Sequence, residues 1–112
     1  SSAVQEVRIS GCFSGQIGNQ NWKNCASITK FYLDADDSSA SIGSNNFELC
    51  SSLNQIYIAA NCSSGFWQGT NNFLNINNNA IFFVDSSVFS EYNNATFSGS
   101  QGIPNGITMQ SI

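Results

Sequence analysis

The stretch that decides the fold covers residues 47–89 and reads FELCSSLNQIYIAANCSSGFWQGTNNFLNINNNAIFFVDSSVF. It holds two of the four cysteines, Cys50 and Cys62, and the strongest apolar run of the chain, AIFFV at residues 80–84. Apolar residues at 56–60 alternate with the period of a strand that has one face inward. Gly, Ser and Asn separate the apolar runs and favour turns. The stretch therefore predicts short strands joined by turns, with the remaining chain packed around them.

Similar alternating runs lie on both sides and predict strands at residues 4–10, 28–35 and 107–110. Roughly seven or eight short strands at intervals of about 8 to 12 residues are typical of a sandwich or barrel. We therefore predict one all-β domain over residues 1–112, a compact sandwich or barrel of antiparallel strands. A short helix is the alternative for residues 51–61, where apolar residues also fall at helical spacing. The expected core consists of apolar strand residues: Leu33, Ile56, Ile58, Ile76, Ile81, Phe83, Val84 and Ile107.

Four cysteines in a short chain rich in Ser and Asn are typical of a secreted protein, because disulfides persist in oxidising compartments. Four cysteines allow three connectivities. The similar spacing of Cys12 to Cys25 and of Cys50 to Cys62 favours two local disulfides. Each would close a loop of about a dozen residues and contribute about 3 kcal/mol in the chain-entropy model. We expect a secreted, extracellular protein with two disulfides.

Two segments match the acceptor pattern for N-linked glycosylation, at Asn61 and Asn94. An acceptor asparagine of this kind lies on the surface of a secreted protein. Such patterns also arise by chance in a chain rich in Asn and Ser. We predict a glycoprotein with these two sites and leave chance occurrence as the alternative.

The charge composition excludes several classes of function. Charged residues make up 9% of the chain, against roughly 25% in an average soluble domain, and the net charge is −4. The three basic residues are too few for a patch that neutralises phosphates, so nucleic acid is not expected as a partner. No apolar run reaches the ~20 residues that span a bilayer. Solubility therefore depends on neutral hydroxyl and amide side chains.

The chain has no histidine, which removes the usual general base, the Ser-His and Cys-His nucleophile systems and the common zinc ligand sets. Carboxylates are the catalytic groups that remain. Asp34, Asp36 and Asp37 are close enough in sequence to share a site, and an Asp-rich turn that ends a strand is the simpler interpretation. A calcium site at these residues is chemically reasonable because hard cations prefer oxygen ligands. We expect no resident metal, no cofactor and no enzymatic activity.

Aromatic and amide side chains occur together in two turns, and this combination suits sugars. A sugar ring presents hydroxyls at its edge and apolar C–H groups on its face, so its site needs a planar ring and neutral hydrogen-bonding groups. The simpler interpretation is core packing for the tryptophans and ordinary turn chemistry for the asparagines. The predicted carbohydrate site combines a stacking ring, amides and two acceptors from a neighbouring strand end: Trp67, Gln68, Asn71, Asn72, Asn77, Asp36 and Asp37.

Residues 47–89 also resemble a known family. The segment CSSL at residues 50–53, the ending IAANC at 58–62 and the segments LNIN and IFFVDSSV at 74–77 and 81–88 are similar to the cyanovirin-N homology pattern. The resemblance implies a fungal or microbial sugar-binding protein. We therefore predict a secreted, lectin-like protein that binds glycans or glycoproteins without transforming them.

Two other functions stay open at this point. A secreted toxin, effector or immunomodulatory protein would use exposed aromatic residues as anchors on a protein partner. A glycoside hydrolase would need two carboxylates facing each other across a cleft. The low charge and amide-rich strand edges would also support a homodimer.

Overall fold

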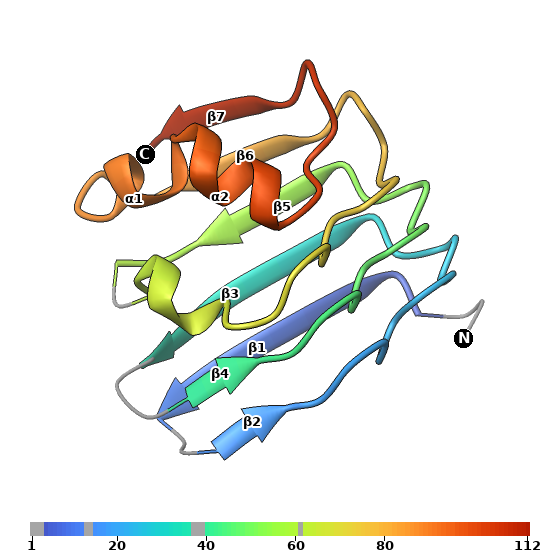
Figure 1. Cartoon of the computed structure of the whole chain (residues 1–112), viewed down its shortest axis with the longest axis horizontal. Coiled ribbons are helices and arrows are strands. Elements are labelled where there is room, and N and C mark those ends of the chain that lie inside the picture. The colour runs from blue at the N-terminus through green and yellow to red at the C-terminus, as the bar shows by residue number, and fades with distance from the viewer. Residues whose placement is uncertain (1–3, 13–14, 37–39, 61) are drawn as a thin grey trace.

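The computed structural model describes residues 4–12, 15–36, 40–60 and 62–112 (Figure 1). Five strands form one parallel sheet in the order β1-β3-β5-β6-β7, and β2 and β4 form a second parallel sheet. The elements follow the chain as β1 (Glu6–Cys12), β2 (Gly15–Ile17), β3 (Lys30–Asp36), β4 (Ala40–Ile42), β5 (Gln55–Ile58), the 3₁₀-helix η1 (Ser64–Phe66), β6 (Ile81–Val84), α1 (Phe89–Tyr92), α2 (Ala95–Ser100) and β7 (Thr108–Ser111).

Neighbouring strands of the larger sheet are related by a nearly constant step along the chain. Glu6 pairs with Lys30, Lys30 with Gln55, Gln55 with Ile81, and Ile81 with Thr108. The chain therefore completes one coil in 24 to 27 residues, and each coil stacks on the one before. In Figure 1 the segments between these strands, with β2, β4, η1 and the two helices, form a second layer against the sheet. This is the architecture of a solenoid repeat protein, in which each repeat packs on its neighbours.

The predicted antiparallel sandwich is wrong, because the strand pairs of both sheets are parallel. From β1 to β5, successive strands alternate between the two layers, so β1 pairs with β3 and β2 with β4. The last three strands, β5, β6 and β7, all belong to the larger sheet. The even spacing of short strands comes from repeated coils and not from hairpins. The helix considered for residues 51–61 is also wrong, since β5 occupies the middle of that segment. The two α-helices form at Phe89–Tyr92 and Ala95–Ser100, where the predicted all-β domain contained no helix.

The predicted core is partly confirmed. Five of its residues are at least 95% buried: Leu33, Ile56, Ile58, Ile76 and Val84. The prediction was wrong for Ile81 and Phe83, which lie half-exposed on the outer face of β6 while Phe82 and Val84 fill the core. A continuous apolar run does not reveal which of its two faces is inward. Ile107 packs against the core but is only partly buried.

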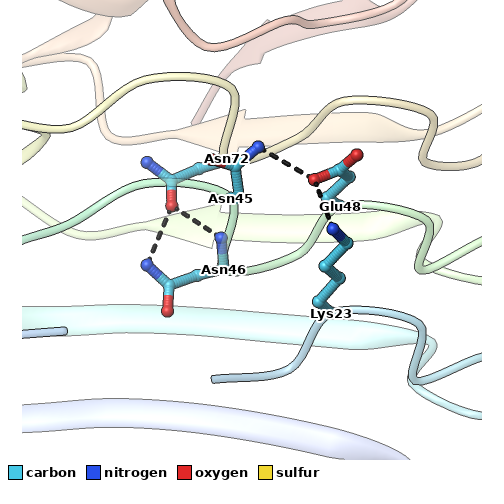
Figure 2. A network of polar contacts seen from close by, with 5 residues as sticks. All are labelled: Lys23, Asn45, Asn46, Glu48 and Asn72. Atoms are coloured by element: carbon cyan, nitrogen blue, oxygen red, sulfur yellow. Dashed lines mark hydrogen bonds and ion pairs between the residues drawn. The ribbon is translucent and has the colours of Figure 1, made fainter. Parts of the chain in front are cut away.

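A ladder of amide side chains joins the coils at one corner, and we call Asn21, Asn46, Asn72 and Gln101 the amide ladder. The Asn46 Oδ1 accepts hydrogen bonds from the backbone N–H and the side-chain amide of Asn21, at 3.1 and 2.8 Å. The Asn72 Oδ1 accepts from the backbone N–H and the side-chain amide of Asn46, at 3.1 and 3.0 Å (Figure 2). Asn72 then donates to Gln101 Oε1 at 2.8 Å. Asn46, Asn72 and Gln101 are buried, and their hydrogen bonds offset the cost of removing these amides from water.

The residues beside each ladder asparagine repeat as well. The residue before it adopts a left-handed backbone, with φ of 59° at Gln20, 62° at Asn45 and 58° at Asn71. The residue after it places a ring in the core. These rings stack with centroid separations of 5.1 and 5.7 Å in the order Trp22, Phe47, Phe73. In each of these three coils, one triplet supplies a left-handed turn residue, a ladder amide and a ring that packs on its neighbours.

Candidate binding site on the sheet face

The exposed face of the larger sheet carries a row of large side chains at one register position. Arg8, Tyr32, Tyr57 and Phe83 occupy consecutive positions on β1, β3, β5 and β6, and we call them the outer row. The centroids of Tyr32 and Tyr57 are 4.7 Å apart, as are those of Tyr57 and Phe83, and both pairs are stacked. The Arg8 guanidinium carbon lies 4.3 Å from the centroid of the Tyr32 ring. The parallel register therefore gathers residues from four coils into one continuous surface.

The rings of the outer row stand side by side, so both faces of Tyr32 and of Tyr57 are covered. The interplanar angles are 9° between Tyr32 and Tyr57 and 15° between Tyr57 and Phe83. Tyr57 thus has a ring against each of its faces, and Tyr32 has Arg8 against its second face. The row presents ring edges and tyrosine hydroxyls to a ligand. Stacking of a sugar face on these rings is therefore disfavoured. The ring edges and hydroxyls remain free to contact apolar and polar groups of a ligand.

A cleft of about 270 Å³ adjoins the outer row at the carboxyl ends of the strands, and we call it the sheet cleft. The Asp85 Oδ1 accepts hydrogen bonds from the Ser87 backbone N–H at 2.9 Å and from its hydroxyl at 2.7 Å. These two hydrogen bonds lower the pKa of Asp85 from its usual value, and the bond from the Ser87 backbone has the larger effect. The cleft therefore contains at least one stably ionised carboxylate. Its walls combine aromatic, aliphatic and charged side chains, among them Arg8, Tyr32, Asp34, Tyr57, Asp85 and Ile112.

A second cleft, of about 460 Å³, lies between η1 and the helices, and we call it the helix-side cleft. Trp67 and Phe97 line it, but each is only 6% exposed. Glu91 Oε1 accepts hydrogen bonds from the Ser64 backbone N–H at 2.9 Å and from its hydroxyl at 3.3 Å. Most of the remaining lining is neutral and polar: Asn94, Thr96, Ser100 and Gln101.

The residues predicted for a sugar site near Trp67 are not gathered around one open surface. The Trp67 ring is packed among Phe31, Phe66, Phe73 and Phe97, and its Nε1 donates to the Tyr92 hydroxyl at 3.3 Å. Asn72 is fully buried in the amide ladder. Trp67 and Asn72 therefore have structural roles that leave little surface for a ligand.

The other amides of that prediction lie nearer the surface. Gln68 is exposed and donates to the Gly65 carbonyl at 2.6 Å. Asn71 supplies a left-handed corner, and its backbone N–H donates to Ser100. Asn77 is half-buried, and its Oδ1 accepts from the Asn79 backbone N–H at 2.8 Å. Each amide serves local turn geometry, the role that the simpler interpretation gave it.

The predicted acidic residues fall in different places. Asp37 lies outside the described residues, and Asp36 is the last residue of β3. Asp34 is exposed and lines the sheet cleft. Among the residues that the structure describes, no group of three or more His, Cys, Asp or Glu side chains is placed to hold a metal ion.

The predicted disulfides are wrong for the described part of the chain, where no cysteines are bridged. Cys50 precedes β5 and Cys62 follows it, so the strand holds them apart. The Cys50 thiol donates to the Trp22 carbonyl at 3.0 Å, and the Cys62 thiol to the Leu33 carbonyl at 3.6 Å. Burial raises the pKa of the Cys50 thiol to about 11, which keeps it protonated and unreactive at neutral pH. These cysteines behave as small core residues.

Of the two predicted glycosylation sites, Asn61 lies outside the described residues. Asn94 is exposed and caps the N-terminus of α2, where its Oδ1 accepts from the Phe97 N–H at 2.8 Å. Its Nδ2 donates to the Glu91 carbonyl at 2.6 Å. A glycan at Asn94 would therefore have to be attached to an amide nitrogen that already has an acceptor.

The outer row was not among the predicted site residues. The signal that would have found the row is the repeat itself, because Tyr32 and Tyr57 are separated by one coil and Phe83 follows one coil later. Residues separated by the repeat length stack on one face of a solenoid.

Comparison with protein-family models, curated protein sequences and solved structures finds no match for this chain. The resemblance of residues 47–89 to the cyanovirin-N homology family therefore stays a prediction. In the described part of the chain, no helix has the length and apolar character needed to cross a membrane.

Proposed function

We propose that the protein is a non-catalytic recognition module that binds a segment of a partner protein across the exposed face of its larger sheet. The observation that carries the proposal is the outer row, in which Arg8, Tyr32, Tyr57 and Phe83 form one contact surface on four adjacent strands. At about 4.8 Å per strand, the row is about 14 Å long. Tyr and Arg are the residues most enriched at the energetic centres of protein interfaces. Stacked rings are also held rigid before binding, which reduces the entropy lost on association.

The Asp85 carboxylate of the sheet cleft supports recognition better than catalysis. A glycoside hydrolase needs one carboxyl group whose pKa is raised, so that it can protonate the leaving group. The pKa of Asp85 is shifted in the opposite direction, downward, by the hydrogen bonds from Ser87. A permanently ionised carboxylate is an acceptor for hydrogen bonds and a partner for cationic groups.

A secreted toxin, effector or immunomodulatory protein belongs to this class of recognition module. The extracellular location stays a prediction, because the argument from disulfides no longer supports it. A homodimer would present two outer rows and raise the avidity for a repetitive partner.

Carbohydrate binding is the second candidate, and the helix-side cleft is the observation that favours it. Its lining of hydroxyls and neutral amides around Trp67 and Phe97 provides the groups that hydrogen-bond sugar hydroxyls. Glu91 adds a charged acceptor, since only one of its two oxygens is used by Ser64. Glycans or glycoproteins would then be the partners, as the resemblance to the cyanovirin-N homology family implies.

Peptide selection tests the first candidate. A phage-displayed library of random peptides is selected on the immobilised wild-type protein, with the Tyr57→Ala variant used for counter-selection. We expect the enriched synthetic peptides to bind Tyr57→Ala at least about 30-fold more weakly, because loss of a central anchor removes about 2 kcal/mol of binding energy. Tyr57→Phe keeps the stacked ring and should bind within a few-fold of wild type. Isothermal titration calorimetry measures all three affinities.

The matched control is Gln68→Ala, which removes an exposed amide on the other layer and should leave peptide affinity unchanged. Thermal denaturation establishes that each variant is folded. Selection of peptides that bind wild type and Tyr57→Ala equally well would contradict the proposed surface. A glycan array probed with wild type and Thr96→Val tests the second candidate, and a silent wild type would rule it out.

A further inference from the structure

The two ends of the solenoid differ, and the end at β1 is open. β1 and β7 are the two edges of the larger sheet (Figure 1). At the β7 end, the Gln101 side chain closes the amide ladder, because its Oε1 accepts from Asn72 and its Nε2 donates to the Gly69 carbonyl at 2.9 Å. At the β1 end, Asn21 donates to Asn46 in the next coil. Among the described residues, no group donates to the Asn21 Oδ1 from a preceding coil. The ladder is thus complete at one end and unfinished at the other.

β1 itself has the features of an unprotected edge strand. It is seven residues long and contains no proline. Its inward residues Val7 and Ile9 are 7% and 9% exposed, so the strand is firmly packed on the core. The Gln5 carbonyl accepts a hydrogen bond from the Thr29 N–H at 2.8 Å. Because backbone groups alternate in direction along a strand, those of the odd-numbered residues of β1 face β3. The N–H and C=O groups of Glu6, Arg8 and Ser10 therefore point outward and are available to another strand.

We propose that a second copy of this chain pairs its β1 antiparallel with this β1, so that the two sheets join into one. The strand edges then meet around a two-fold axis, the commonest symmetry of dimers. In a head-to-tail arrangement, β1 would pair with β7 of the second copy. This arrangement is disfavoured because the second layers of the two ends do not match: that layer is extended in the first coil and helical in the last coil. Such an arrangement would also grow without closing.

The charges on β1 select one register. Antiparallel hydrogen-bonded pairs must join residues whose backbone groups point outward, which restricts them to even-numbered positions. Pairing Glu6 with Glu6, or Arg8 with Arg8, would place like charges opposite each other. Centring the axis on Val7 instead places Glu6 opposite Arg8 of the second copy, and Arg8 opposite Glu6. The strand is therefore self-complementary in charge in this one register.

Charge reversal followed by mixing tests the dimer. Sedimentation velocity of the wild-type protein over a graded concentration series should show a mass rising from 12.1 kDa toward twice that value. Glu6→Arg alone and Arg8→Glu alone should each weaken the dimer at least about tenfold, because each places like charges opposite each other twice. An equimolar mixture of the two variants should restore association as a heterodimer, since each Arg then faces a Glu.

Gln110→Arg, on the opposite edge strand, is the matched control and should leave the dimer unchanged. Circular dichroism and thermal denaturation confirm that every variant is folded. A wild-type protein that stays monomeric to its highest soluble concentration would overturn the proposal. A dimer that ignores both single reversals, or one that Gln110→Arg disrupts, would overturn it as well, because the contact would then lie on another surface.

Discussion

Replacing Asn46 by Ala is expected to lower the free energy of unfolding by about 3 to 5 kcal/mol. The substitution leaves the Asn21 N–H and the Gly18 carbonyl without their ladder partner and removes one donor from Asn72 Oδ1. The Asn46 side chain makes four hydrogen bonds, and each contributes about 0.5 to 1.5 kcal/mol. Because a domain of this size has a total stability of about 5 to 15 kcal/mol, the variant should be close to unfolding at physiological temperature. Urea denaturation followed by circular dichroism measures the difference.

Asn21→Ala is the matched control for Asn46→Ala. Asn21 is exposed, and its side chain makes one ladder hydrogen bond, to the Asn46 Oδ1. In the Asn21→Ala variant this oxygen still accepts from the backbone N–H of residue 21. We expect a loss below about 1 kcal/mol. Equal losses for the two variants, or a loss below about 1 kcal/mol for Asn46→Ala, would show that the amide ladder does not hold the coils together.

Replacing Gly69 by Ala is expected to have the second large effect, a loss of about 3 kcal/mol or more through overpacking. The added Cβ would overlap the carbonyl group of Gly43 and lie 2.5 Å from the backbone nitrogen of Ser44. Both obstacles are backbone atoms of the adjacent coil, which cannot rotate away as a flexible side chain would. Chemical denaturation of the purified variant, or its recovery as insoluble protein, measures the effect.

Gly18 provides the matched control, because it occupies the same place in the first coil. The carbonyls of Gly18, Gly43 and Gly69 each accept a hydrogen bond from the next ladder amide. An added Cβ at Gly18 meets no atom within 4 Å, since no described coil lies beneath it. Gly18→Ala should be nearly neutral, and a destabilisation equal to that of Gly69→Ala would contradict the stacking.

Strand positions were predictable from the sequence, but strand pairing was not. Alternation located β1, β3 and β7 to within a few residues, because that pattern depends on local burial alone. Pairing depends on contacts between residues one coil apart, which no local pattern records. The repeat was visible in the triplets Gln20-Asn21-Trp22, Asn45-Asn46-Phe47 and Asn71-Asn72-Phe73. Read individually, they indicate turns; read together, at a spacing of about 25 residues, they indicate a solenoid.

The candidate binding surface was harder to predict, for a related reason. Trp67 attracted the carbohydrate hypothesis because it lies in a turn beside amides, yet its ring is 6% exposed. The amides of such a turn pair with backbone and ladder groups, which consumes the hydrogen-bonding capacity that a sugar would need. Tyr32 and Tyr57 gave no local signal, since each is an ordinary strand residue until the parallel register stacks them.

The most direct test of the stacked coils is a nuclear Overhauser measurement on the aromatic ring protons of Tyr57 in the wild-type protein. We expect contacts from Tyr57 to both Tyr32 and Phe83, because the centroids lie 4.7 Å away on each side. Those two residues are one coil before and one coil after Tyr57, so both contacts together, without close Hα–Hα contacts between the strands, indicate the stacked parallel register. Contacts to only one of them, or the close Hα–Hα contacts of antiparallel pairs between β3 and β5, would contradict the solenoid and the binding surface built on it.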